Sequence, residues 1–331
     1  MNQVSIFLLK CLSHGYSRFW RPTIKTDYNT LGRKEGNELL YKILSSDRPC
    51  MIARYGANEI NCISNYLAIK NNDHNIWKII KGESHGWWWN KGMLNELYRV
   101  AGFFPIDDEH LSRFSELMLE DSKDLDVLAI FPSVYKNLPN LLPYIPTDIP
   151  LIQLVSFDSF LYDNPWTKIL KGRNVLVIHP FAELIEEQYK NRNRLFNNTD
   201  VLPSFNLITI KAVQSMSGVN TNGYKDWFEG LCWMKEEMDK QNYDIVLLGC
   251  GAYGFPLAAH AKRTGHKAVH IGGSLQLLFG IKGKRWENPL YGHKVGIPQG
   301  TYSELLKNSA WVSPTAYRTR ESEKAENACY W

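Results

Sequence analysis

The sequence of 331 residues lacks the segments that would mark a membrane-spanning, secreted or disulfide-stabilised protein. No apolar run approaches the roughly 20 residues that a helix needs to cross a bilayer. The apolar stretch at the N-terminus has no small-residue cleavage site of the kind that ends a secretory signal. None of the six cysteines forms a Cys-x-x-Cys pair, so we expect buried thiols in a reducing compartment. These absences predict a cytoplasmic protein.

Several motifs that carry known chemistries are also absent. The chain has no phosphate-binding P-loop, no Gly-x-Ser-x-Gly, no His-Glu-x-x-His and no EF-hand pattern. Its net charge is only +4 and it contains no run of five like charges, so we expect no nucleic-acid partner. With 44% hydrophobic and 22% charged residues, the composition is that of a globular protein.

An arm of residues 1–25 precedes the body of the chain. Its apolar side chains recur every three or four residues, as on one face of a helix, and Pro22 ends the pattern. Two interpretations remain open: an amphipathic helix on the inner face of a membrane, or a helix packed on the body of the protein. The apolar positions are Val4, Phe7, Leu8, Cys11, Leu12 and Phe19, and the basic ones are Lys10, His14, Arg18 and Arg21.

The body, residues 26–331, alternates short apolar strands with helices. This alternation predicts an α/β fold with a Rossmann-like, mostly parallel sheet flanked by helices, in one catalytic unit of two lobes, about 26–170 and 171–331. The expected strands are 50–53, 126–130, 151–155, 173–178, 207–211, 244–248 and 267–271. The expected helices are 36–44, a helix beginning near 59, a broken pair within 76–100, 109–121, 182–195, 227–240 and 257–264.

A glycine-rich turn follows the strand 244–248. A phosphate can approach a backbone closely only where Cβ is absent, and the next helix offers free amides to an anion. The turn therefore predicts a phosphate site, although close packing of helix on strand would also select these glycines. The candidate residues are Gly249, Gly251, Ala252, Tyr253 and Gly254.

The surroundings of this turn argue against two common cofactors. A nicotinamide dinucleotide fold places an acid at the end of the next strand, but this sequence has His270 there, followed by Gly272. Methyl-donor enzymes usually carry an acid just before the turn, where this chain has Leu247 and Leu248. We keep His270 and Gly272 as candidate contacts to a nucleotide of another kind.

A second strand-to-helix turn reads Arg54-Tyr-Gly56-Ala57-Asn58-Glu59. Arg54 can clamp a diphosphate with its planar guanidinium, and Glu59 can bind a metal, accept a sugar hydroxyl or act as a base. A structural ion pair at Arg54 and a helix-dipole role for Glu59 remain the alternative.

This turn resembles the Arg-aromatic-Gly-Asp-x-Glu motif of the GT-D-fold glycosyltransferases. The resemblance extends loosely over residues 30–290, and the strand, glycine turn, helix and strand near the C-terminus are similar to that family's closing region. In the family, the Asp and Glu bind a metal beside the nucleotide-sugar diphosphate. Arg54, Gly56 and Glu59 match by position, and Asn58 occupies the variable place.

Ala57 stands where the family has the Asp. A single carboxylate is a poor site for Mn²⁺ or Mg²⁺. We therefore expect no metal-binding residues in the chain, and an activity that depends weakly or not at all on a divalent ion. The tail segments Trp311-Val-Ser-Pro and 327–331 resemble chains of bacterial surface-polysaccharide synthesis.

Other residues are candidates for catalysis or binding. His179 ends a strand and Glu183 follows it, so either is placed to deprotonate an acceptor hydroxyl. Lys284 and Arg285 lie in a basic loop beside Trp286, which suits a diphosphate with a stacked base. The segment 214–218 is expected to line the cleft, and 85–89, with three Trp, is a candidate acceptor platform.

The resemblance, together with these residues, implies a glycosyltransferase of the hexosyltransferase type. It would move a sugar from a nucleotide-sugar donor to a glycan or lipid-linked acceptor in bacterial polysaccharide synthesis. Two alternatives remain open: a Rossmann-type oxidoreductase or epimerase acting on nucleotide sugars, and a non-catalytic nucleotide-binding subunit.

Overall fold

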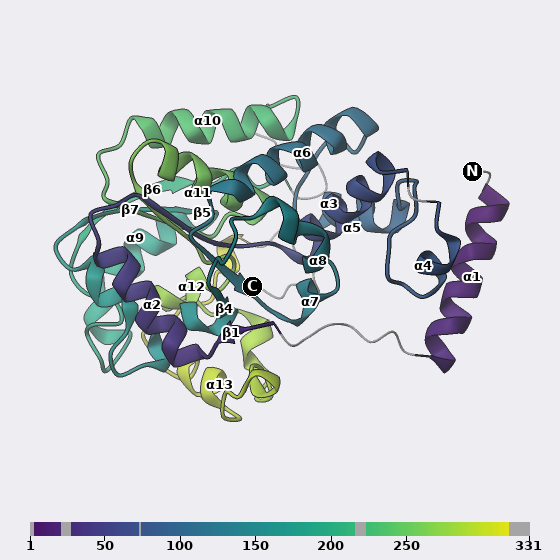
Figure 1. The fold of residues 1–331 in the computed structure, drawn as a ribbon. Helices are drawn as coiled ribbons and strands as arrows, with labels where there is room; N and C mark the ends of the chain where they lie inside the picture. Colours follow the sequence, from purple (N-terminus) through teal and green to yellow (C-terminus); the bar gives the residue numbers. More distant parts are fainter. Residues whose placement is uncertain (1–2, 21–27, 73, 216–222, 318–331) are drawn as a thin grey trace.

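A computed structural model describes residues 3–20, 28–72, 74–215 and 223–317. Its centre is an eight-stranded sheet in the order β1-β4-β3-β2-β8-β7-β5-β6, and neighbouring strands pair in parallel (Figure 1). The predicted α/β fold with a parallel sheet is therefore confirmed. The strands are β1 (Thr30–Leu31), β2 (Cys50–Arg54), β3 (Val127–Ile130), β4 (Leu151–Gln153), β5 (Asn174–His179), β6 (Asn206–Lys211), β7 (Ile245–Leu248) and β8 (Lys267–His270).

Helices cover both faces of this sheet. Side chains of α3, α5, α6, α10 and α11 bury one face, and those of α2, α9 and α12 bury the other. The helices are α1 (Gln3–Phe19), α2 (Arg33–Ser45), α3 (Ala57–Lys70), α4 (Ile76–Ile80), α5 (Lys91–Arg99), α6 (Asp108–Asp121), α7 (Pro132–Tyr135), α8 (Leu138–Leu141), α9 (Ala182–Lys190), α10 (Trp227–Asp239), α11 (Gly254–Arg263), α12 (Leu275–Leu278) and α13 (Thr301–Leu305).

The central strands are apolar on both sides because both sides are covered. In β2, Met51 and Ala53 pack into one core, whereas Cys50 and Ile52 pack into the other. Period-two alternation of side chains thus divides one continuous apolar run between two cores, as expected for a buried parallel strand.

The halves of the chain meet in the middle of the sheet. Strands β1 to β4 form one half and β5 to β8 the other, and they join where Cys50 of β2 pairs with Lys267 of β8. The division into lobes near residue 170 stays a prediction, since the sheet runs across it. The carboxyl ends of β2, β5, β7 and β8 lie along one edge, where open α/β folds bind ligands.

One strand was missed and two predicted boundaries need correction. Strand β1 was not expected, because two residues carry too little pattern to be recognised. The strand expected at 151–155 ends at Gln153, and Leu154–Phe157 forms a 3-10 turn. The helix expected at 182–195 ends at Lys190. There the side-chain amide of Asn191 donates to the backbone carbonyl of Glu187 (3.4 Å), which competes with continuation of the helix.

The N-terminal arm forms α1 as expected, and α1 contacts α4 (Figure 1). Arg21 and Pro22 lie outside the described residues. Across the described ranges, no helix is both long and apolar enough to span a membrane.

Candidate functional site

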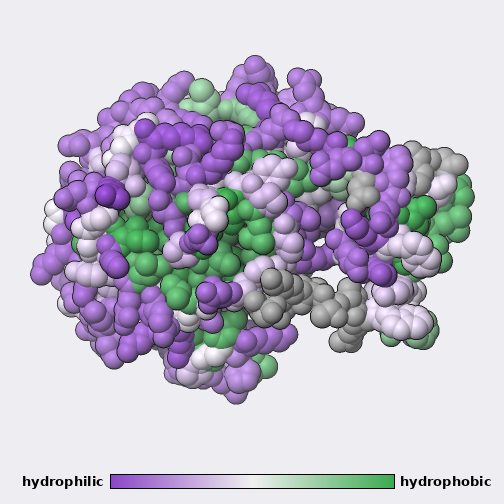
Figure 2. Space-filling model, in the orientation of Figure 1, coloured by the Kyte–Doolittle hydropathy of each residue, from purple (hydrophilic) through white to green (hydrophobic). Residues whose placement is uncertain are grey.

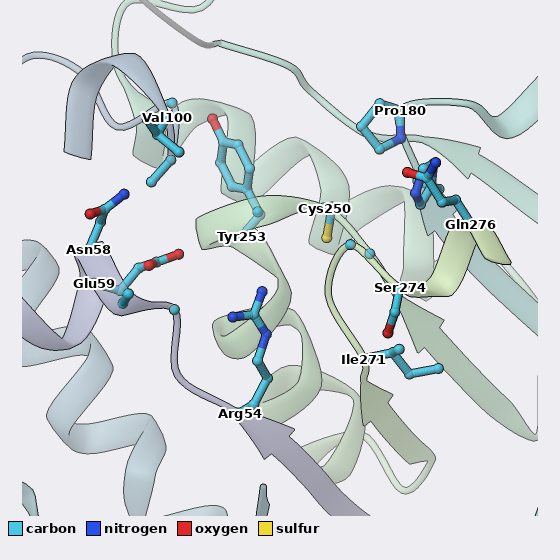
Figure 3. Close-up of a pocket in the computed structure, with 18 of the residues that line it drawn as sticks. Arg54, Asn58, Glu59, Val100, Pro180, Cys250, Tyr253, Ile271, Ser274 and Gln276 are labelled. Carbon is cyan, nitrogen blue, oxygen red and sulfur yellow. The ribbon is translucent and has the colours of Figure 1, made fainter. Parts of the chain in front are cut away.

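A cavity of about 380 Å³ opens at the carboxyl edge of the sheet. Most of the residues that we predicted from the sequence for binding and catalysis line this cavity, and they come from turns that are far apart in the chain. In Figure 3, Arg54 and Glu59 point into this cavity from one side, and Tyr253, Cys250 and Ser274 border it from the other. The proposed residues that line it are Arg54, Gly56, Asn58, Glu59, His179, Gly249, Gly251, Tyr253 and Arg285.

Arg54 is the cation at the centre of this site. Its Nη1 donates to the carbonyl of Tyr55 (3.3 Å), and its guanidinium lies 5.8 Å from the ring centre of Phe131. Its Nε is buried without a hydrogen-bond partner, and no ion pair is found for it among the described residues. The structural ion pair considered for Arg54 is therefore not observed. A buried N–H without an acceptor is costly, so the group is suited to an anionic ligand.

Gly272 makes room for Arg54. It has φ +80°, and a Cβ there would lie 2.4 Å from Nη2 of Arg54. Gly272 does not line the cavity, so its effect on a ligand would act through the arginine rather than by contact.

The glycine-rich turn lies partly at the cavity and partly against β8. Gly249 and Gly251 line the cavity, and a Cβ on Gly249 would lie 2.7 Å from the ring of His179. Gly254 instead packs against β8, where a Cβ would lie 2.4 Å from the ring of His270. Close packing therefore accounts for both Gly249 and Gly254, and binding of a phosphate by this turn stays a prediction.

His270 and Ala252 require correction as binding residues. Both are buried and neither lines the cavity. Burial and the neighbouring charge of Arg54 hold the pKa of His270 well below its usual value, so this histidine is neutral. It fills space beneath α11, and it leaves the end of β8 without the acid that a nicotinamide dinucleotide fold uses.

His179 lines the cavity as a neutral hydrogen-bond donor. The backbone N–H of Phe181 donates to Nδ1 of His179 (3.0 Å), so the ring proton is on Nε2. Burial lowers the pKa of His179 to about 3. With one nitrogen occupied and the other protonated, this ring is poorly suited to the general-base role considered from the sequence.

Glu59 is the one carboxylate among the lining residues that the structure describes. It lies in the first turn of α3 and is 7% exposed. Its side chain folds back over Gly56, where a Cβ would overlap the carboxyl group. Glycine at position 56 is thus a condition for this placement of Glu59.

A divalent ion does not fit the donor set found here. Ala57 offers no side-chain oxygen, and Glu59 alone supplies fewer ligands than Mg²⁺ or Mn²⁺ requires. Elsewhere in the described ranges, no three His, Cys, Asp or Glu side chains form a group that could hold a metal. Among the described residues that line the cavity, the positively charged side chains are Arg54 and Arg285.

Glu183 and Lys284 lie outside the cavity. Glu183 is exposed and pairs with Lys211 (2.7 Å), and the hydroxyl of Tyr317 donates to its other oxygen (3.2 Å). Lys284 is exposed and does not line the cavity, whereas its neighbour Arg285 does. Of the two residues proposed in the basic loop, only one therefore lines the cavity.

Other expectations are partly met. Gln214 and Ser215 line the cavity, while 216–218 lie outside the described residues. The tryptophan segment does not line it: Trp87 stacks on His74 (4.4 Å), and the side chain of Asn65 donates to the carbonyl of Trp88 (3.0 Å). Of the tail segments, 327–331 is not described.

Several lining residues had not been predicted. Gln276 is buried, and its amide donates to the carbonyl of Lys282 (2.8 Å), which fixes its orientation. Cys250 is buried, and burial raises the pKa of its thiol, so it is not a ready nucleophile. Cys250 lies within the glycine-rich turn, so that motif could have identified it, whereas Gln276 stands in no motif and only the arrangement of the sheet brings it to the cavity. Ser274, Tyr291 and residues 100–102 also belong to this group.

No protein-family model and no curated protein matches this sequence. Two solved structures are similar over 96% of this chain and 97% of theirs, each at 11% identity. One is a selenomethionine-substituted structure of domain of unknown function 1792 (TM-score 0.41). The other is described as "The highly conserved domain of unknown function 1792 has a distinct glycosyltransferase fold" (TM-score 0.43). At these scores the similarity carries no argument about activity, which rests on the cavity itself.

Proposed function

We propose that this protein is a cytoplasmic glycosyltransferase. It would move a hexosyl group from a nucleotide-sugar donor to a hydroxyl of a glycan or lipid-linked acceptor in bacterial polysaccharide synthesis. The observation that carries the proposal is Arg54, a cation with no ion pair among the described residues and with a buried Nε that lacks an acceptor. A donor diphosphate would supply both the charge and the acceptor.

The backbone around the cavity supports the same ligand. The first residues of α3, from Ala57, line one side of the cavity, and the turn that leads into α11 at Gly254 lines the other. The start of α3 adds the positive end of a helix dipole, whereas the amide of Gly254, the first residue of α11, already donates to the carbonyl of Gly251. With Arg54 between them and one carboxylate in the lining, this part of the cavity favours an anion.

The rest of the lining suits the remaining parts of a donor. Tyr291, beside Arg285, offers aromatic surface to a nucleobase, and the ring centre of the buried Trp286 lies 6.2 Å from that of Tyr291. Ser274, Gln276 and Asn58 present hydroxyl and amide groups of the kind that orient sugar hydroxyls.

The proposed reaction is a substitution at the anomeric carbon. The acceptor oxygen forms a bond to that carbon, the bond from the carbon to the diphosphate breaks, and its electron pair leaves with the diphosphate. The proton of the acceptor hydroxyl passes to Glu59, the carboxylate of the lining. Arg54 and the turn amides stabilise the charge that develops on the leaving diphosphate.

A nicotinamide enzyme is less consistent with this site. The residue at the end of β8 is a buried, neutral histidine rather than an exposed acid, so a ribose hydroxyl would find no carboxylate there. A non-catalytic nucleotide-binding subunit would share the diphosphate site but would have no use for a carboxylate in the cavity.

The test measures nucleoside diphosphate release from a panel of nucleotide sugars, with and without glycan acceptors. We expect one donor class to turn over. Glu59→Gln should lower turnover by roughly 10²–10⁴-fold, the usual contribution of a general base, while donor affinity changes little. Glu183→Gln is the matched control and should behave as wild type, because Glu183 lies outside the cavity. Binding of donors without release of product would favour the non-catalytic subunit and contradict the proposal.

A further inference from the structure

Helix α1 carries two apolar faces, and only one of them is used in the fold. On the used face, Leu9 is buried, and the hydroxyl of Ser13 donates to the carbonyl of Ile79 at the end of α4 (3.4 Å). This contact fixes the side of α1 that faces the protein.

The second face lies beside the contact with α4 and is not covered by it. At 3.6 residues per turn, positions 4, 7, 8, 11, 12, 15 and 19 fall on one arc of the helix, and Leu9 lies outside it. Figure 2 shows apolar surface on α1 at the right of the view. The large side chains of this face are strongly exposed: Val4 66%, Phe7 65%, Leu8 56%, Leu12 56% and Phe19 75%.

The apolar surface continues from α1 onto α4. Trp20 follows the end of α1 and is 64% exposed, and on α4 Trp77 is 69% and Ile76 is 47% exposed. A shallow groove between the two helices, lined by Leu12, Phe19, Ile76 and Trp77 among others, joins the two parts. The exposed surface is therefore shared by two segments that are about sixty residues apart in the sequence.

Basic side chains border this surface. Lys10, His14 and Arg18 follow each other at a spacing of four along one edge of α1, and residues 3–20 contain no Asp or Glu. On the other side of the groove, Lys78 and Lys81 belong to α4 and its C-cap. Glu83 is the one acid in residues 74–83.

We propose that this surface, α1 with Trp20 and α4, docks onto an anionic lipid bilayer, with α1 lying in the plane of the interface. Exposed Phe, Leu and Trp beside a basic edge are the features of interfacial helices, which bury the apolar face among the acyl chains and place the cations at the headgroups. A second copy of the chain fits less well, because pairing the apolar faces would bring two basic edges together.

The experiment is sedimentation of the full-length protein with vesicles of phosphatidylcholine alone or mixed with phosphatidylglycerol. Wild type should bind the mixed vesicles and should dissociate as salt is raised. The double variant Leu8→Gln, Phe19→Gln removes exposed apolar area, and Lys10→Glu, Arg18→Glu reverses the basic edge. Each should weaken partitioning by roughly tenfold or more.

Two control variants separate this effect from a general change of surface. Leu290→Gln alters a leucine that is 55% exposed, close to the 56% of Leu8, and Lys171→Glu reverses an exposed charge far from α1 in the chain. Both should bind vesicles as wild type does, with unchanged melting temperatures throughout the set. Vesicle binding that is the same in all variants would overturn the proposal. So would a concentration-dependent dimer that Leu8→Gln, Phe19→Gln disrupts, because it would assign the surface to a second copy.

Discussion

The position of Arg54 depends on the glycine that lies beside its guanidinium group. Gly272 has φ +80°, which favours glycine, and a side chain there would displace Nη2 of Arg54. Gly56 does the same for Glu59. Arg54 and Glu59 are thus each placed by a residue without a side chain, which explains why these turns need glycine.

At the scale of single residues, Ala57 determines the response to metals. We expect wild-type turnover to survive a chelator, because the lining provides one carboxylate where a hard cation wants several oxygens. Ala57→Asp places a second carboxylate two residues before Glu59. It should create measurable Mn²⁺ binding in calorimetry, with Ala57→Asn as the uncharged control. Loss of wild-type activity with chelator, restored by metal, would show that this interpretation of Ala57 is wrong.

At the scale of elements, the contact between α11 and β8 is set by Gly254. Its φ of −61° is helical, so an alanine there meets no conformational strain, but its Cβ would lie 2.4 Å from the His270 ring. We expect Gly254→Ala to lower the free energy of unfolding by about 1–3 kcal/mol, the usual cost of overpacking.

Gly92→Ala is the matched control for this prediction. It also lies in a helix, α5, but its Cβ would meet nothing closer than 3.5 Å, so the substitution should raise stability by up to about 1 kcal/mol. Urea unfolding of the two variants measures both effects. Equal shifts in the same direction would show that the contact with His270 does not limit packing here.

The elements that could be predicted from sequence are those whose apolar pattern is long enough. The strands around residues 127, 175 and 245 are continuous apolar runs bounded by turns, and each was found within one or two residues. Strand β1 has two residues, and its pairing with Leu151 and Ile152 is decided by tertiary contact. Patterns within a segment cannot report such pairing.

The same limit applies to the candidate site. Residues at the end of a strand or directly after it, such as Arg54 and Gly249, do line the cavity. His270 also follows this rule but is buried beneath α11, because a residue at the end of a strand can face either side of the sheet. Gln276 enters the cavity from a short helix with no motif of its own.

At the scale of the whole molecule, a buried acid links distant segments. The hydroxyl of Tyr302, in α13, donates to Asp158 (2.6 Å), which is buried. Burial raises the pKa of Asp158 from 3.8 to about 6, and the hydrogen bond from Tyr302 opposes part of the shift. The carboxyl group of Asp158 therefore binds its proton more tightly in the folded state than in the unfolded chain.

This shift predicts a pH dependence of stability. Because the folded pKa is raised, the contribution of Asp158 is fully present below about pH 4 and is lost as the pH rises through about 6. Asp158→Asn keeps an oxygen for Tyr302 but cannot titrate. Relative to wild type, its free energy of unfolding should rise across this interval by on the order of 2–3 kcal/mol. Urea unfolding at several pH values tests this, with exposed Asp163→Asn as control; parallel curves for Asp158→Asn and wild type would contradict it.

The central claim is that the cavity binds the diphosphate of a nucleotide through Arg54. The most direct measurement is calorimetric titration of nucleoside diphosphates and of nicotinamide dinucleotide into wild type, Arg54→Gln, Arg54→Lys and Arg48→Gln. Arg48 is exposed and precedes β2, at the end opposite Arg54, so it is the matched control.

We expect a nucleoside diphosphate to bind wild type and Arg48→Gln equally. Both Arg54 variants should bind it roughly tenfold to hundredfold more weakly, since an ammonium cannot reproduce the planar guanidinium. Nicotinamide dinucleotide should not bind. Tight binding of the nicotinamide cofactor, or diphosphate binding that is unchanged in Arg54→Gln, would contradict the account.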